Sequence, residues 1–298
     1  MLEIKKYGAI DIGSNAIRLL ISNVIVTEDR EPKFKKSSLV RVPIRLGADA
    51  FVNGIISEQN TKRIINAIEA FKLLMDIHGV ERYKACATSA MREAKNGTQI
   101  AAEIFNKTGV KIDIIDGKEE AAIISSTDLK DLISGNNSYL YVDVGGGSTE
   151  FTLFSEGKII SSKSFKMGTV RLLNNKKSVN KENFANVEKW IKKNTKGLKK
   201  ISLIGSGGNI NKLFKMSGRT EGKPISYIYL NAQYQFLKQM SFNERVSELS
   251  LNPDRADVII PATKIYLSAM KWSGATKIYV PKIGLSDGII KSLFYNKL

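Results

Sequence analysis

The chain has 298 residues, a formal net charge of +17, 43% hydrophobic residues and 25% charged residues. This composition is typical of a soluble globular protein, and the length suffices for two domains with substantial cores. Cys86 is the only cysteine and His78 the only histidine, which argues against internal disulfides, Ser-His-Asp triads, Cys-His pairs and zinc sites. Acid-base chemistry then falls to Asp, Glu, Lys or Tyr, and a metal would be a hard cation held by oxygen atoms.

The first part of the chain alternates strand and helix patterns, as in an α/β sheet. Residues 7–26 predict two strands joined by the turn Gly13-Ser14-Asn15, and a further strand is expected from Leu39 in "LVRVPIRLG". Beyond these, strands are expected at 82–90 and 110–117, and helices at 57–79, 90–109 and 118–133. Ser57, Asn60 and Thr61 are possible N-terminal caps of the first helix and Gly79 is its expected C-terminal cap, and Cys86 is expected to be a buried thiol.

The second part of the chain repeats the opening. "SYLYVDVGGGSTEFTLFSEGKIISSKSF", residues 138–165, predicts three strands with turns at 145–147 and 156–158. A helix starting at "MGTVRLL", a strand and helix in "KKISLIGSGGNINKLFKM", a polar link, a helix over 252–274, and a final strand and helix follow. The two similar openings, at Asp11 and Asp143, indicate an internal duplication. We expect domains of residues 1–124 and 125–298, with the alternative that the terminal helix packs back on the first domain.

The positive charge favours a polyanionic partner, such as nucleic acid, an anionic membrane or a phosphate-rich substrate. The densest basic stretch is Lys176–Lys200, with a smaller cluster at Lys33–Lys36, although such runs usually form a solvated face. No RNA-binding signature with interleaved aromatic residues is present, so nucleic acid is not the favoured partner. No run reaches the length of a membrane helix and "MLEIKKYGAID" predicts a strand, so we expect a cytoplasmic protein with no membrane partner.

Glycine-rich turns between strands are the candidate phosphate-binding sites. Without Cβ atoms, successive backbone N–H groups can converge on an anion, and adjacent Ser or Asn side chains add donors. Gly13-Ser14-Asn15 and Gly145-Gly146-Gly147-Ser148 both have this composition, and each follows a strand that ends in Asp. A third turn, Gly207-Gly208, opens a helix, where an ordinary strand-to-helix connection is the alternative. The P-loop motif is absent from the sequence.

Eight motifs in order resemble one family, the exopolyphosphatase / guanosine pentaphosphate phosphohydrolase family. They are "AIDIGSNAIRLL", "ATSAMREA", "DGKEEA", "VDVGGGSTE", "FKMGTVRL", "GSGGNINKL", "DRADVIIPA" and "GLSDGII". This resemblance runs from about residue 7 to residue 290 and implies an α/β fold of two actin-like (ribonuclease H-like) domains with an active-site cleft between them. Longer members carry a C-terminal domain built on an HD metal motif, which we expect to be absent from this short form.

The resemblance also implies residue roles. Glu120 matches the catalytic glutamate that deprotonates the attacking water, with its neighbour Glu119 as the competing candidate. Asp143 and Glu150 match positions that hold Mg²⁺ or orient the water, and Asp11 would assist them. Several carboxylates facing one site repel each other unless a divalent cation lies among them, so a metal, Mg²⁺ or alternatively Mn²⁺, is expected.

The expected phosphate contacts come from the glycine turns and one arginine. Arg92 matches an arginine that contacts phosphate oxygens, with a structural ion pair to Glu93 as the alternative. The other expected phosphate-binding residues are Ser14, Asn15, Gly145, Gly146, Gly147, Ser148, Gly207 and Gly208. Arg171 and Arg255 match motif positions, but no role is assigned to them from the sequence.

The favoured function is an exopolyphosphatase, which removes the terminal phosphate of inorganic polyphosphate. The same residues would serve the hydrolysis of guanosine pentaphosphate, and the excess of basic residues favours polyphosphate. A polyphosphate or alarmone sensor without turnover and a small-molecule kinase are the alternatives from other classes. Because relatives often pair, a homodimer is an alternative to a monomer.

Overall fold

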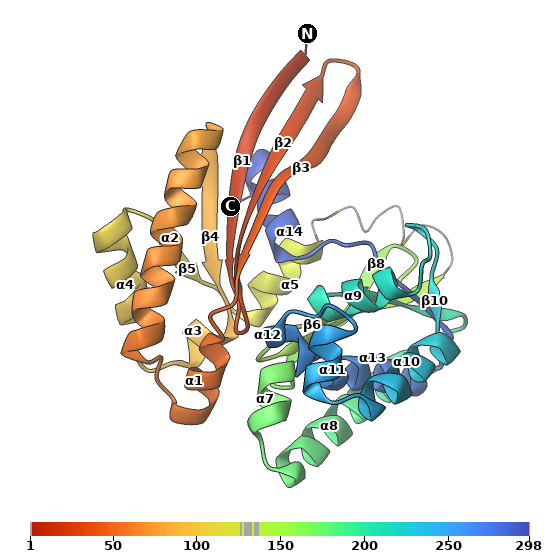
Figure 1. Cartoon of the computed structure of the whole chain (residues 1–298). Helices are drawn as coiled ribbons and strands as arrows, with labels where there is room; N and C mark the ends of the chain where they lie inside the picture. Colours follow the sequence, from red (N-terminus) through yellow and green to blue (C-terminus); the bar gives the residue numbers. More distant parts are fainter. Residues whose placement is uncertain (1, 126, 128–132, 134–136, 298) are drawn as a thin grey trace. The chain divides into compact units, whose positions relative to one another are not determined.

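The computed structural model describes residues 2–125, 127, 133 and 137–297, and it divides into two compact units (Figure 1). Unit 1 consists of Met1–Thr127 together with Gly284–Leu298, and unit 2 consists of Asp128–Ile283. The boundary expected from the sequence fell after residue 124. The terminal helix belongs to unit 1, which is the alternative that the sequence analysis left open.

Unit 1 contains a five-stranded sheet in the order β3-β2-β1-β4-β5. Its strands are β1 (Leu2–Ile12), β2 (Ile17–Thr27), β3 (Arg30–Val42), β4 (Arg82–Ala87) and β5 (Ile112–Ile114). Its helices are α1 (Leu46–Asn53), α2 (Glu58–His78), α3 (Ser89–Glu93), α4 (Gly97–Thr108), α5 (Gly117–Ser125) and α14 (Leu285–Phe294). Strands β1, β2 and β3 are antiparallel, whereas β4 runs parallel to β1 and β5 runs parallel to β4.

Helices cover both faces of the sheet in unit 1 (Figure 1). On one face, Phe71 of α2 and Ile104 of α4 belong to the same buried apolar cluster as Ile10 of β1. On the other face α14 contacts β1, β2, β4 and α5, and its Phe294 ring lies 6.4 Å from that of Tyr7. Since Asp11 alternates with Ile10 and Ile12, it faces the same side of the sheet as Tyr7.

The first long helix begins and ends where the sequence predicts. The Ser57 hydroxyl accepts a hydrogen bond from the Asn60 amide at 3.3 Å, and Gly79 ends α2 in the left-handed conformation with φ 67°. A side-chain oxygen at the N-cap satisfies an otherwise unpaired backbone donor, and glycine adopts the left-handed region without a Cβ penalty. The caps predicted for α2 are therefore confirmed.

Unit 2 contains a six-stranded sheet in the order β10-β11-β9-β6-β7-β8. Its strands are β6 (Ser138–Val144), β7 (Thr149–Ser155), β8 (Lys158–Phe165), β9 (Ile201–Ser206), β10 (Ile225–Ser226) and β11 (Lys277–Tyr279). Its helices are α7 (Thr169–Asn174), α8 (Lys177–Thr195), α9 (Gly208–Met216), α10 (Tyr227–Gln239), α11 (Phe242–Ser247), α12 (Pro253–Ala256) and α13 (Ile259–Ser273). The buried helix α13 contacts α7, α8, α9 and α10.

The two sheets share one topology, which confirms the internal duplication. Read from its far edge, the second sheet begins β8-β7-β6-β9-β11, in the same order as β3-β2-β1-β4-β5. In each case three antiparallel strands are followed by two parallel ones, with the short β10 added at the edge of unit 2. This is the ribonuclease H-like arrangement of the actin-like domains, so the predicted α/β fold of two such domains is confirmed.

Several element boundaries differ from the sequence prediction. The strand expected through "LVRVPIRLG" ends at Val42, and α1 begins at Leu46. The helix expected over 90–109 is divided into α3 and α4, because the chain turns and Gly97 packs directly on Met91, where a Cβ would lie 1.9 Å from the carbonyl oxygen. The helix expected over 252–274 is likewise divided into α12 and α13.

Two further differences concern the middle of the chain. The polar link expected after Met216 contains α10 and α11, which the sequence analysis missed. Of the helix expected over 118–133, the structure shows α5, which ends at Ser125. Residues 126 and 128–132 of that prediction lie outside the described residues.

The lone cysteine is a buried structural thiol, as the sequence predicts. Cys86 has no exposed surface, and burial raises the pKa of its thiol to about 12. Because the thiolate is the reactive form, we expect no reaction of the native protein with a thiol-specific disulfide reagent at mildly alkaline pH. In denaturant, the Cys86 thiol should react with one equivalent of the reagent. Rapid reaction of the folded protein would contradict this burial.

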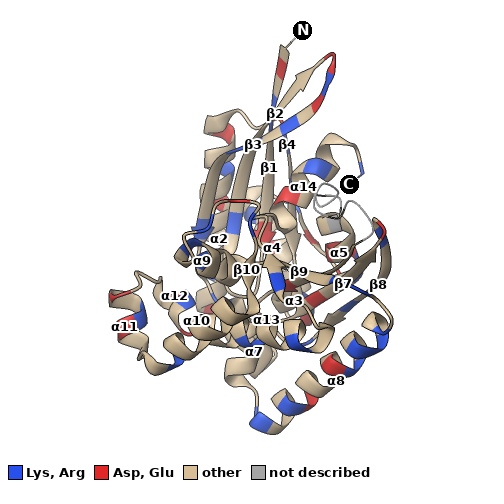
Figure 2. Cartoon of the chain, turned by 90° about the vertical axis from the view of Figure 1, so that its right-hand side faces the viewer, with Lys and Arg blue, Asp and Glu red and all other residues tan. Residues whose placement is uncertain are grey.

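Basic residues occur in both units, and α8 contains several of them along its length (Figure 2). Within the described part of the chain, no helix is long and apolar enough to cross a membrane.

Candidate active site

The glycine turn of unit 2 joins β6 to β7 and is held by the first turn of α7. Within the turn, the Gly145 amide donates to the Ser148 carbonyl at 3.0 Å. The turn's carbonyls accept hydrogen bonds from α7: Thr169 N to Gly145 O at 3.0 Å, Val170 N to Gly146 O at 2.9 Å, and Arg171 Nε to Gly147 O at 2.8 Å. The backbone N–H groups at the start of α7 thus donate to carbonyls of the turn, and no side chain among the described residues caps this helix.

This arrangement determines where the N–H groups of the turn point. In a trans peptide the N–H is directed opposite to the carbonyl of the same unit. Since the carbonyls of Gly145, Gly146 and Gly147 face α7, the amides of Gly146, Gly147 and Ser148 face away from it. Backbone N–H groups that are not used within the fold can bind an anion, which is the role that the sequence analysis predicted for this turn.

Gly168 makes the close approach of α7 possible. A Cβ at this position would lie 2.3 Å from the carbonyl carbon and oxygen of Gly146 and from the nitrogen of Gly147. Such overlap with backbone atoms has no low-cost relief, so only glycine fits there without displacing the turn. The motif "FKMGTVRL" contains this glycine, but the sequence alone did not assign it a role in the site.

Asp143 and Glu150 lie opposite each other on β6 and β7. Directly opposed residues of antiparallel strands project to the same face, so the two carboxylates are neighbours. Glu150 is buried, with 3% of its surface exposed, and its Oε1 accepts hydrogen bonds from Ser148 at 2.6 Å and Ser164 at 2.9 Å. These two hydroxyls fix the orientation of Glu150, one of the three predicted metal ligands.

Two buried tyrosines lie near Asp143. The Tyr141 hydroxyl lies 3.5 Å from Asp143 Oδ2, and the Tyr266 hydroxyl donates to the carbonyl of Ser206. Burial raises the pKa of both phenols well above its usual value, and the negative charge of Asp143 raises it further. Both phenols therefore remain neutral, and they shape the polar environment of Asp143 as hydrogen-bond donors.

The third glycine turn lies beside the same carboxylate. Gly207 has φ 114°, and a Cβ there would lie 3.0 Å from the Val144 carbonyl oxygen and 3.6 Å from Asp143 Oδ1. A Cβ on Gly208 would lie 2.8 Å from Arg255 Nη2, so this guanidinium covers the first residue of α9. Unit 2 therefore brings together both of its predicted glycine turns, its two predicted acids and Arg255.

The glycine turn of unit 1 is held in a corresponding way. The Ser14 carbonyl accepts a hydrogen bond from Gly47 N at 2.8 Å, and the Asn15 carbonyl accepts one from Arg45 N at 3.0 Å. These donors lie at the beginning of α1, as the donors in unit 2 lie at the beginning of α7. The Ser14 hydroxyl is buried and lies 2.9 Å from that of Ser89 in α3.

Asp11 differs from its counterpart Asp143 in its cross-strand partner. Asp11 lies opposite Arg18, and its Oδ2 accepts from Arg18 Nη1 at 2.8 Å. The charge of this predicted metal ligand is thus balanced within unit 1. Among the described residues, no group of three or more His, Cys, Asp or Glu side chains is arranged to hold a metal. Asp143 and Glu150, with oxygen donors on one face, fit a hard cation better than Asp11 does.

Arg92 and Glu120 lie in unit 1 on neighbouring segments. Arg92, in α3, donates through Nη1 to the Ile115 carbonyl at 2.6 Å, just before α5. Glu120 lies in the first turn of α5 and is partly buried.

The hydrogen bonds at the beginning of α5 distinguish the two candidate glutamates, Glu119 and Glu120. The Glu119 carboxylate accepts from the Asp116 amide at 3.0 Å, while Asp116 Oδ1 accepts from the Lys118 amide at 2.7 Å and the Glu119 amide at 2.8 Å. These backbone N–H groups lower the pKa of Asp116. The Glu119 carboxylate thus caps the start of α5. Because it is engaged there, Glu120 is the better candidate for the base.

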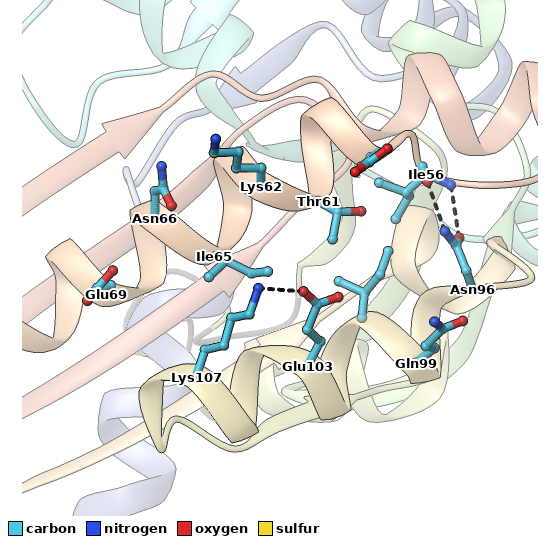
Figure 3. A pocket seen from close by; sticks show the side chains of 12 residues that line it. Ile56, Thr61, Lys62, Ile65, Asn66, Glu69, Asn96, Gln99, Glu103 and Lys107 are labelled. Atoms are coloured by element: carbon cyan, nitrogen blue, oxygen red, sulfur yellow. Dashed lines mark hydrogen bonds and ion pairs between the residues drawn. The ribbon is translucent and has the colours of Figure 1, made fainter.

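A pocket of about 650 Å³ lies elsewhere in unit 1, between α2 and α4 (Figure 3). Lys107 forms an ion pair with Glu103 at 2.8 Å there, and the Asn96 amide side chain bonds the backbone of Ile56 in both directions. None of the predicted site residues lines this pocket.

Two ribonuclease H-like units, each with a glycine turn whose carbonyls are held by the following helix, define a protein of the actin-like fold. A sequence profile of the Ppx/GppA phosphatase family matches residues 25–297, and the chain belongs to that family. The resemblance found from the motifs is therefore confirmed.

Individual relatives agree with this family. The chain is 31% identical to a bifunctional 3-dehydroquinate synthase/phosphatase of Fusobacterium nucleatum over 92% of its own length, but it spans only 44% of that protein. It is 25% identical to exopolyphosphatase 2 of Mycobacterium tuberculosis over 98% of this chain and 99% of that one. The crystal structure of an exopolyphosphatase from Cytophaga hutchinsonii has the same fold, with a TM-score of 0.86, 23% identity and 98% of both chains covered.

Proposed function

We propose that the protein is an exopolyphosphatase, which hydrolyses the terminal phosphoanhydride bond of inorganic polyphosphate and releases orthophosphate. The observation that carries the proposal is the cluster in unit 2, where outward-facing turn amides lie next to two neighbouring carboxylates. Amide donors suit the phosphate oxygens, and paired carboxylates suit a divalent cation that accompanies a polyanionic substrate. The family assignment and the net charge of +17 support the same substrate class.

In this proposal the terminal phosphate is bound by the amides of Gly146, Gly147 and Ser148, with Ser14 and Asn15 of unit 1 adding polar groups. Arg92 balances negative charge on the phosphate oxygens, as does the guanidinium of Arg255 beside the Gly207-Gly208 turn. Asp143 and Glu150 would hold Mg²⁺ or Mn²⁺, which when bound neutralises part of the substrate's charge.

Glu120 accepts a proton from the water that attacks the terminal phosphorus. The new P–O bond forms as the bond to the bridging oxygen breaks, so orthophosphate and a polyphosphate shortened by one unit leave. Because phosphoryl transfer requires little covalent chemistry from the protein, positioning and charge balance account for most of the catalysis.

The first test is phosphate release from long-chain polyphosphate in Mg²⁺, measured beside guanosine pentaphosphate at equal concentration. We expect faster release from polyphosphate, and loss of release when EDTA removes the divalent cation. Faster release from the nucleotide would assign the protein to guanosine pentaphosphate hydrolysis with the same residues. Tight binding of either compound without release would instead support a sensor, and ATP-dependent phosphorylation of a small molecule would support a kinase.

A further inference from the structure

Unit 2 exposes a band of lysines centred on α8, here called the α8 basic surface. It consists of Lys181, Lys189, Lys192 and Lys193 on α8, Lys163 on β8 and Lys264 on α13, all exposed. Figure 2 shows basic residues at several places along α8. The reaction proposed above uses none of these residues.

Burial on the opposite side of α8 keeps these lysines in solvent. Val187, Ile191 and Thr195 are buried against the core of unit 2, at a spacing of one helical turn. The helix has 19 residues and is therefore about 28 Å long. The surface is thus an extended strip, which suits a linear ligand better than a compact one.

Lysines from two other elements border the strip on separate sides. Lys163 Nζ lies 4.9 Å from the centroid of the Phe165 ring, which itself contacts the Trp190 ring of α8 at 6.0 Å. Lys264 Nζ lies 4.8 Å from the centroid of the Phe184 ring, also on α8. Cation–π contacts of this kind hold the ammonium groups beside the helix. Three elements of the fold therefore contribute charge to one surface.

The charge of the surface is poorly balanced within the protein. Two acids, Glu182 and Glu188, lie on α8, and Glu188 pairs with Lys192 at 2.6 Å. Lys189 and Lys193 are one helical turn apart, an arrangement of like charges that destabilises a helix. A bound polyanion would remove this repulsion.

The surface is connected to the glycine turn through α7. The first turn of α7 bonds the Gly145–Gly147 carbonyls, and Asn180 of α8 donates through Nδ2 to the Leu172 carbonyl of α7 at 2.9 Å. Hydrogen bonds therefore link the turn to α7 and α7 to the beginning of α8 within unit 2. When the end of a linear substrate is bound at the turn, the rest of the substrate can bind to the α8 basic surface of the same unit.

We propose that the α8 basic surface is an accessory binding site for linear polyphosphate, which holds the part of the chain away from the terminal phosphate. The proposal rests on the proposed exopolyphosphatase function. It implies that the affinity for substrate depends on chain length, because only a chain long enough to extend from the glycine turn to α8 contacts this surface. Since exposed charges are screened by salt, the contribution should also decline as ionic strength rises.

The test is the triple variant Lys181→Gln, Lys189→Gln and Lys193→Gln, with KM measured for long-chain polyphosphate and for tripolyphosphate. Loss of three exposed charge contacts should raise KM for the long chain on the order of ten-fold at low salt. We expect kcat for both substrates, and KM for tripolyphosphate, to remain as in the wild type. Direct binding of end-labelled long-chain polyphosphate, measured by fluorescence anisotropy, should weaken by the same factor.

A matched control removes three lysines elsewhere, with Lys33→Gln and Lys35→Gln on β3 and Lys62→Gln on α2, all exposed. This variant loses the same net charge and should bind long-chain polyphosphate as the wild type does. An equal loss in both triple variants would show a nonspecific effect of net charge and overturn the proposal, as would an unchanged KM in the α8 variant. If the wild type binds long-chain polyphosphate through α8 but releases no phosphate, the accessory site stands and the hydrolase proposal fails. Stronger α8-dependent binding of RNA than of polyphosphate would overturn the accessory site.

Discussion

Replacing Glu120 by Gln is expected to lower the rate of phosphate release by about 10²- to 10⁴-fold, the usual contribution of a positioned general base. The amide keeps the size of the side chain but cannot accept the proton of the attacking water. Because Glu120 is only partly buried in the first turn of α5, the free energy of unfolding should change by less than about 0.5 kcal/mol. Steady-state phosphate release and urea denaturation of the same preparation measure both quantities.

The neighbouring variant Glu119→Gln is the control. Gln can make the same capping contact to the Asp116 amide that Glu119 makes, so α5 should begin unchanged. We expect activity within about two-fold of the wild type, since exposed substitutions away from the reacting groups have small effects. If Glu119→Gln abolishes release while Glu120→Gln retains it, the base has been assigned to the wrong glutamate.

Replacing Gly168 by Ala is expected to reduce phosphate release on the order of 100-fold, because a displacement of about 1 Å in a positioned group can cost that much. The added Cβ would overlap the Gly146 carbonyl and the Gly147 nitrogen at 2.3 Å, so α7 and the glycine turn must separate. Overpacking of this kind should also lower the free energy of unfolding by about 1–3 kcal/mol. Activity must therefore be measured at a temperature where the variant is fully folded.

Gly197→Ala separates the effect on stability from the effect on the site. Gly197 has φ 82°, and a Cβ there meets no atom within 4 Å, so the substitution strains the backbone without touching a neighbour. We expect a loss of about 1–2 kcal/mol in the free energy of unfolding and unchanged phosphate release. Should Gly168→Ala keep full activity per folded molecule, the hydrogen bonds of α7 do not position the turn for catalysis.

Much of the fold follows from local patterns in the sequence. Hairpins with Gly, Ser and Asn between alternating apolar residues gave the strands β1, β2, β6 and β7, and the caps of α2 were readable from Ser57 and Gly79. The helix α10 was missed because it is largely solvent-exposed, with Ile228 80% exposed, so its pattern lacks a clear apolar face. The break between α3 and α4 depends on the contact of Gly97 with Met91, which local propensity does not encode.

The candidate site was predictable in its residue types but not in its supporting contacts. The opposed position of Asp143 and Glu150 follows from the symmetry of a hairpin around Gly145–Ser148. The same reasoning applied to the first hairpin would have placed Arg18 opposite Asp11, and that signal was overlooked. By contrast, the hydrogen bonds from Arg171 and its neighbours to the glycine turn join segments separated by the two strands β7 and β8, so only the folded structure shows them.

The two hairpins have the same geometry but different electrostatic requirements. In the first, the position opposite the strand-end aspartate holds a cation, so the pair is neutral by itself. In the second, the same position holds another acid, Glu150, so two carboxylates lie opposite each other on the two strands. The position opposite the strand-end aspartate therefore carries opposite charges in the two copies of the duplicated fold. Duplication thus produced two hairpins with one backbone geometry, and they differ in charge at one strand position.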